Sequence, residues 1–172
     1  VKSSVTLNNC TFTNNTAGDK GGAMHYANDY SPILNNCTFT NNSASVGGGI
    51  FYLNSSPILN NCIFEDNWAE TDGGGMLCYT SSATLDNCMF ADNTAGDKGG
   101  GVACVNSGSS TLDNCTFVRN AADKGGGVAC WSNSSVTLDN GILWDNSALS
   151  LVNSEIYYNS GGHVTVTYSN IK

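Results

Sequence analysis

Cysteine is the residue type in this chain with the clearest capacity for covalent or metal chemistry. Eight cysteines occur in 172 residues, and five of them recur at intervals of 25 to 27 residues: Cys10, Cys37, Cys62, Cys88 and Cys115. Side chains at one position of a repeat point in the same direction, which orients them poorly for a disulfide. Because the chain has no Cys-x-x-Cys or Cys/His pair, a zinc site is also disfavoured. We therefore predict buried free thiols that act as small apolar residues.

Aspartate also recurs at the repeat distance and could bind a cation. Asp86, Asp113 and Asp139 occupy one repeat position. Three like charges about 5 Å apart repel one another, so either solvent screens them or a cation such as calcium bridges them. We favour a solvated acidic edge and keep these three residues as a weak candidate for a metal site. Apart from calcium at these aspartates, no cofactor is expected.

Residues that could act as a general acid, base or nucleophile are few and scattered. A lyase would need a basic residue, but Arg119 is the only arginine and shares its repeat position with Asp92 and Asp145, which predicts charge pairing at the surface. A hydrolase would need two carboxylates facing each other across a substrate, and here acids form pairs only by repetition. His25 and His163 lie about five repeats apart without a nucleophile motif. We predict that the protein is not an enzyme, with a polysaccharide lyase or hydrolase as the least favoured alternative.

A repeat of about 26 residues must position all of these side chains. Each unit contains short apolar segments separated by Asn, Gly, Asp and Ser, which predicts three short β-strands per unit. No segment has the 3.6-residue apolar period of a helix. The sequence therefore predicts an all-β parallel β-helix, the solenoid architecture that pectate-lyase-like enzymes share. It should have about six and a half coils, each about 4.8 Å above the last.

Several repeat positions have architectural roles. The motif Phe-x-x-Asn should place its asparagine where the chain turns, so that stacked asparagines hydrogen-bond to one another and to the turn. The glycines that follow suggest a corner with positive φ or close backbone approach. In the last unit Ile156 and Tyr158 lie 28 residues after Val128 and Cys130, which predicts a coil enlarged by two residues. The asparagines of the predicted ladder are Asn15, Asn42, Asn67, Asn93, Asn120 and Asn146.

The two linked motifs, Phe-x-x-Asn and Gly-Gly-(Ala/Gly)-(Ile/Met/Val), each occur five times. Together they resemble the repeats of the chlamydial polymorphic outer-membrane proteins and related bacterial right-handed β-helix surface proteins. The resemblance covers about Val5 to Val128 and continues more weakly to Ile171. It implies right-handed winding and a secreted, surface-displayed autotransporter passenger with adhesive roles. We expect residues 1–172 to be one β-helix domain, a segment of a longer bacterial cell-surface or secreted protein that acts as a non-catalytic stalk or adhesin.

Apolar and aromatic residues recur on the strand that follows the glycines, at positions expected to face outward. They are Phe51, Leu53, Leu77, Tyr79 and Trp131. An exposed strip of this kind on a rigid solenoid would be a contact face for a host protein or a glycan. Two alternatives remain open, namely that flanking loops cover the strip or that it packs against a neighbour.

Two further functions are compatible with the repeat. Thr6, Thr84, Thr111 and Thr137 share an outward row that could bind ice on a flat face, although threonine is common at any outward β position. The strand edges at the two ends of a β-helix are unpaired. End-to-end self-association into a structural fibre would satisfy them.

Charge and hydropathy exclude other partners. The net charge is −8 with six Lys and Arg residues, so a phosphate-binding face is disfavoured and nucleic acid is not expected as a partner. No apolar run is long enough to cross a bilayer, so we expect no direct membrane insertion by this segment.

Overall fold

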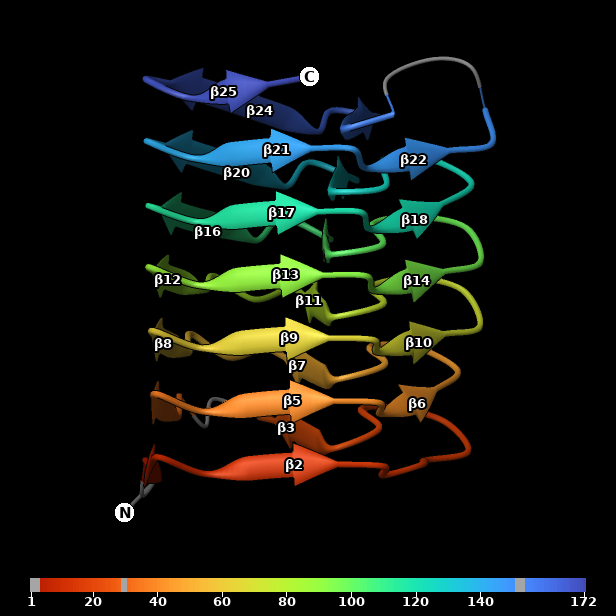
Figure 1. Ribbon diagram of the computed structural model, residues 1–172. Coiled ribbons are helices and arrows are strands. Elements are labelled where there is room, and N and C mark those ends of the chain that lie inside the picture. The colour runs from red at the N-terminus through yellow and green to blue at the C-terminus, as the bar shows by residue number, and fades with distance from the viewer. Residues whose placement is uncertain (1–3, 29–30, 151–153) are drawn as a thin grey trace.

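The chain winds into a stack of coils in which each strand lies parallel to its counterpart one repeat away (Figure 1). This computed structural model describes residues 4–28, 31–150 and 154–172. Those residues form 25 strands of two to five residues each. The same ranges contain no helix, and hence none long and apolar enough to cross a membrane. The predicted all-β parallel solenoid is confirmed.

The strands form four sheets, numbered here in the order in which the chain meets them. Sheet 1 consists of β1 (Thr6–Asn8), β4 (Ile33–Asn35), β8 (Ile58–Asn60), β12 (Thr84–Asp86), β16 (Ser109–Asp113), β20 (Ser135–Asp139) and β24 (His163–Thr167). Sheet 2 consists of β2 (Thr11–Thr13), β5 (Thr38–Thr40), β9 (Ile63–Glu65), β13 (Met89–Ala91), β17 (Thr116–Val118), β21 (Ile142–Trp144) and β25 (Asn170–Ile171). Sheet 3 consists of β6 (Ser43–Ala44), β10 (Trp68–Ala69), β14 (Thr94–Ala95), β18 (Ala121–Ala122) and β22 (Ser147–Ala148). Sheet 4 consists of β3 (Met24–Ala27), β7 (Ile50–Leu53), β11 (Met76–Tyr79), β15 (Val102–Val105), β19 (Val128–Trp131) and β23 (Ile156–Asn159).

The strand pairs fix how the coils are stacked. The first coil contains β1 to β3, the next five coils contain four strands each, and β24 and β25 begin a seventh. Val128 pairs with Ile156 and Thr137 with Thr165, which confirms the coil enlarged by two residues. The prediction of three strands per coil is wrong from the second coil on, because the structure adds the two-residue strands of sheet 3. Two residues are too few to show an apolar alternation in the sequence.

A residue with positive φ marks each bend of a coil. Between sheets 1 and 2 this residue is an asparagine in the first six coils, such as Asn36 with a φ of 53°. Between sheets 3 and 4 it is a glycine in the first five coils, such as Gly99 with a φ of 67°. Glycine adopts this left-handed conformation freely and asparagine more readily than other residues, so these repeat positions determine where the chain bends. At the Phe-x-x-Asn motif the left-handed residue is the one before the asparagine, such as Asn41 with a φ of 54°.

Identical side chains stack into columns inside the coils. The rings of Phe12, Phe39, Phe64, Phe90 and Phe117 lie nearly parallel, with centroids 4.6 to 5.0 Å apart. Such offset contacts between aromatic rings add to the stabilisation from apolar burial. The phenylalanine column and its leucine and cysteine neighbours form one continuous core from coil to coil.

The cysteines are part of this core. All eight are free, seven are buried and Cys10 is partly buried, which confirms the prediction of buried thiols. The contact with the Cys115 thiol, together with burial, raises the pKa of Cys88 to about 12, and burial raises the pKa of Cys130 to about 11. Because the thiolate is the reactive form, these two groups are expected to be inert near neutral pH.

The asparagine ladder is confirmed and runs through the stack. At Asn93 the side-chain oxygen accepts hydrogen bonds from the backbone N–H and the Nδ2 of Asn67, at 3.0 and 2.9 Å. The Nδ2 of Asn93 donates to the Phe64 carbonyl and to the Oδ1 of Asn120, both at 2.9 Å. A different residue ends the ladder. Glu155 accepts the backbone N–H of Asn146 at 3.2 Å and its Nδ2 at 2.5 Å.

Glu155 should make stability depend on pH. The side chain is 7% exposed, and burial raises its pKa above the ordinary 4.5, although hydrogen bonds from Asn146 act in the opposite direction. Just above pH 4.5 the folded protein therefore retains a proton that the unfolded chain has released. The stabilisation from this group is fully present below pH 4.5 and is lost as the pH rises through the raised pKa. We expect Glu155→Gln to remove this slope from urea unfolding free energies measured between about pH 4 and pH 7.

The exposed Glu70 offers a matched control for this measurement. Glu70→Gln should leave the slope of wild-type stability with pH unchanged. If the free energies of unfolding of the wild type and of Glu155→Gln changed with pH in parallel, the folded state would not hold the extra proton.

Candidate functional site

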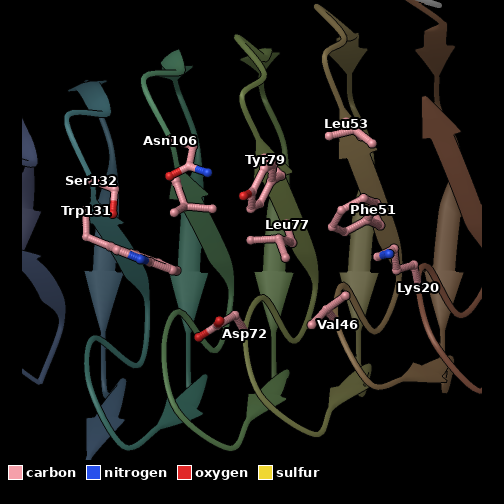
Figure 2. Close-up of a pocket in the computed structure, with 11 residues that line it drawn as sticks. Lys20, Val46, Phe51, Leu53, Asp72, Leu77, Tyr79, Asn106, Trp131 and Ser132 are labelled. Carbon is pink, nitrogen blue, oxygen red and sulfur yellow. The ribbon is translucent and has the colours of Figure 1, made fainter. Parts of the chain in front are cut away.

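A groove of about 550 Å³ crosses the outer surface of sheet 4 (Figure 2). Four successive strands of sheet 4 contribute to its lining: β7 and β11 each contribute two outward residues, and β15 and β19 contribute one each. All five residues of the predicted contact face line the groove: Phe51, Leu53, Leu77, Tyr79 and Trp131. The sequence therefore identified the surface on which this groove lies.

The floor of the groove is buried, contrary to expectation. Phe51 and Leu77 were predicted to be exposed, but each is only 3% exposed. They form a small outer cluster with Val105, against which Val46 packs from the loop that precedes sheet 4. The Lys20 ammonium lies 5.7 Å from the centre of the Phe51 ring. These loop contacts correct the prediction for the two residues, in agreement with the alternative that flanking loops cover the strip.

One aromatic side chain is exposed on the side of the groove away from the loops. Tyr79 is 38% exposed, whereas Leu53 and Trp131 are partly buried. The Trp131 side chain extends from β19 toward β15 (Figure 2), where the small Ala103 occupies the floor position. The Lys98 ammonium lies 5.1 Å from the centre of the Trp131 ring, a cation–π contact that holds the indole against the groove.

The side of the groove formed by the loops that precede sheet 4, called the loop bank below, carries an ionic network. Lys98 pairs with Asp97 and lies 4.0 Å from Asp72, and Lys124 reaches Asp97 at 2.9 Å. Burial raises the pKa of Asp72 above its ordinary value. Burial acts in the same direction on Asp97, but the hydrogen bonds from Lys98 and Lys124 outweigh it and hold the pKa of Asp97 below its ordinary value.

Asp72 is one of the groove residues that the sequence did not reveal. It pairs with Lys98 along the corner-loop column, and its Oδ1 is closed off from solvent with no hydrogen-bond partner among the described residues. The column consists of Lys20, Val46, Asp72, Lys98 and Lys124. The signal available in the sequence was therefore one acid at a repeat position where three of the five residues are lysine.

The threonine row has the predicted register. Thr84, Thr111 and Thr137 pair in sequence on sheet 1, Thr6 begins the row, and Thr165 extends it. Isoleucines replace threonine in the second and third coils. Thr6, Thr84 and Thr137 are exposed and Thr111 is partly buried. Ice binding by this face stays a prediction.

The aspartate column lies two residues further along the same strands. Asp86, Asp113 and Asp139 are in register, as predicted. Two of these carboxylates accept one hydrogen bond each. Asp86 accepts from the Nδ2 of Asn114 at 2.7 Å, and Asp139 accepts from the Thr167 hydroxyl at 2.8 Å. Among residues 4–28, 31–150 and 154–172 no three acids, cysteines or histidines converge in a manner that could hold a metal ion. Calcium binding at the column stays a prediction without a ligand set.

The residues considered for catalysis are kept apart or are already paired. Arg119 donates two hydrogen bonds to Asp92, at 2.8 and 2.6 Å, which confirms the predicted surface pairing. His25 on β3 lies in the first coil and packs edge-on against Phe51, with ring centres 5.1 Å apart. His163 on β24 lies in the last coil. The two histidines cannot act on one substrate.

Comparison with known proteins supports the architecture. A family model described as "Right handed beta helix region" matches residues 1–143. Searches of curated proteins and of solved structures gave no match. The match covers most of the chain and agrees with the predicted winding, without distinguishing the chlamydial proteins within this group. On this match and the stacked parallel coils, the chain belongs to the right-handed β-helix family.

Proposed function

We propose that the protein is a non-catalytic cell-surface or secreted β-helix, an adhesin-type passenger segment that holds its ligand in the groove on sheet 4. The groove carries this proposal, because it joins an apolar floor to the exposed Tyr79 ring, the partly buried Trp131 ring and a polar bank. Its volume of about 550 Å³ is in the usual range of ligand pockets. The surface location and the bacterial origin rest on the likeness of the repeats to the chlamydial polymorphic outer-membrane proteins.

The scaffold suits a binding role. The four coils that line the groove are bonded to one another through all four sheets, so the groove lining is fixed by regular strands on one side. Loops that pack on Phe51 and Leu77 fix the other side. A preformed site of this kind loses little conformational entropy when a ligand binds.

A non-catalytic role is supported by the groove itself. Neither histidine and no arginine lines it, and its acid Asp72 lies beside Lys98 rather than opposite a second free carboxylate. A pair of facing carboxylates or an unpaired base is what hydrolysis or elimination would require.

Removing the aromatic rings of Tyr79 and Trp131 should weaken binding strongly. We expect the double variant Tyr79→Ala/Trp131→Ala to lose about 30-fold or more in affinity, because aromatic side chains at the centre of a site commonly contribute about 1 kcal/mol or more each. The measurement is binding to an oligosaccharide array and to immobilised collagen, fibronectin and laminin.

Trp68 on β10 provides the control, because it is 47% exposed and lies on sheet 3 away from the groove. Trp68→Ala should bind as the wild type does. Binding that survives the double variant but fails in Trp68→Ala would place the ligand on another face and defeat the proposal.

A further inference from the structure

The groove lining is repeated along the axis of the stack. Its outward residues come from β7, β11, β15 and β19 in four successive coils, and one row has a member in each coil: Leu53, Tyr79, Val105 and Trp131. Leu53 and Trp131, at the two ends of this row, are thus three strand spacings apart, about 14 Å. A ligand that lies along the axis meets an equivalent lining position at every coil. This geometry suits a short polymer of similar units better than a single compact molecule.

Because the floor of the groove is buried, few ligands could be stabilised there by covering apolar surface. Phe51 and Leu77 are each 3% exposed and Val105 is 6% exposed, so little apolar area remains for a ligand to cover. Apolar burial stabilises a complex by roughly 25 cal/mol per Å², and an apolar peptide would therefore gain little here. The accessible groups are the flat Tyr79 ring and polar side chains at the rim, including Asn106 and Ser132. These groups fit a ligand with one apolar face and many hydroxyl groups.

The charges of the loop bank argue against an acidic ligand. Lys20 lies 3.3 Å from Asp19, and Lys98 and Lys124 pair with Asp97. The bank therefore offers no free cation in the part of the groove that the structure describes. Asp72 adds a carboxylate that is 22% exposed, and with Oδ1 closed off from solvent, Oδ2 is the acceptor that a ligand can reach. The chain as a whole has a net charge of −8.

These observations, which rest on the binding function proposed above, point to one ligand class. We propose that the groove binds a neutral oligosaccharide along the axis of the stack, with Asp72 accepting a hydrogen bond from a sugar hydroxyl. Tyr79 and Trp131 support the apolar faces of the sugar rings, and the polar rim meets the remaining hydroxyl groups. No bond of the ligand is broken.

Hexasaccharides of glucose, of N-acetylglucosamine and of galacturonic acid provide the test. Titrations are followed by the fluorescence of the three tryptophans, with Trp68→Ala as a control that retains Trp131. We expect one of the neutral hexasaccharides to bind and the galacturonic acid hexasaccharide to bind at least about tenfold more weakly. Asp72→Asn keeps the side-chain shape and should weaken the neutral ligand about tenfold, because a charged acceptor forms the stronger hydrogen bond. Circular dichroism checks that each variant is folded.

The outcomes separate this inference from the proposed function. Preferred binding of the acidic hexasaccharide, or unchanged affinity in Asp72→Asn, would overturn the inference. Binding only to collagen, fibronectin or laminin, abolished by Tyr79→Ala/Trp131→Ala, would overturn the oligosaccharide ligand and leave the groove as the binding site. If no sugar or protein probe depends on Tyr79 and Trp131, both proposals are wrong.

Discussion

Asn93→Ala should destabilise the fold by about 4 kcal/mol. The Asn93 side chain accepts two hydrogen bonds from Asn67 and donates one each to Asn120 and to the Phe64 carbonyl. Alanine removes all four and leaves two donors of Asn67 buried without an acceptor. An unsatisfied buried polar group costs about 1–3 kcal/mol. Urea unfolding followed by circular dichroism measures the change in the free energy of unfolding.

An asparagine at an exposed corner is the control for this experiment. Asn61 has a φ of 53° and accepts one hydrogen bond from Asn87, at 2.6 Å. Asn61→Gly keeps the left-handed conformation and should change stability by no more than about 0.5 kcal/mol. Equal losses in Asn61→Gly and Asn93→Ala would mean that the buried ladder contributes no more than a surface corner.

Gly100→Ala is the second substitution with a large expected effect. A Cβ at position 100 would lie 2.4 Å from the Ala121 carbonyl oxygen and 2.5 Å from that of Gly126. Both are backbone atoms of the hydrogen-bonded stack, so neither can move away as a flexible side chain could. We expect a loss of about 3 kcal/mol or more, or failure to accumulate as soluble protein. Thermal unfolding measures the loss where the variant folds.

Gly18 allows a control within the same sequence motif. The segment Thr16 to Gly22 is identical to the segment Thr94 to Gly100, but a Cβ at Gly18 would meet nothing within 4 Å. Gly18→Ala should be neutral or slightly stabilising, because alanine restricts the unfolded chain. A large loss in Gly18→Ala would show that alanine in this loop is harmful for a reason other than collision with the neighbouring coil.

The repeat made much of the fold predictable. Constant spacing fixed which residues share a column, and the structure confirms the registers of the phenylalanines, asparagines and aspartates. The enlarged sixth coil followed from one offset shared by Ile156, Tyr158 and Thr165. Side chains in register need only local strand geometry and the length of the repeat, and both are visible in the sequence.

The groove was predictable only in outline. The sequence identified its five apolar and aromatic residues, but not that the preceding loops fold onto Phe51 and Leu77. Loop residues such as Val46 and Asp72 have no strand periodicity, and their contacts depend on how far each loop leans over sheet 4. The strands of sheet 3 were not predicted for a related reason, because two residues are too few to show an alternation of apolar and polar side chains.

Glu155 also affects the electrostatics of the asparagine ladder, beyond the hydrogen bonds that it accepts. From Asn15 to Asn120 each asparagine side chain donates to the asparagine of the next coil, so the amide dipoles of the six ladder residues are aligned along the stack. Aligned dipoles leave partial positive charge at the donor end, as they do at the first turn of an α-helix. Glu155 lies at that end. Its carboxylate is a counter-charge to the ladder, and a lysine at position 155 would instead set like charges against each other.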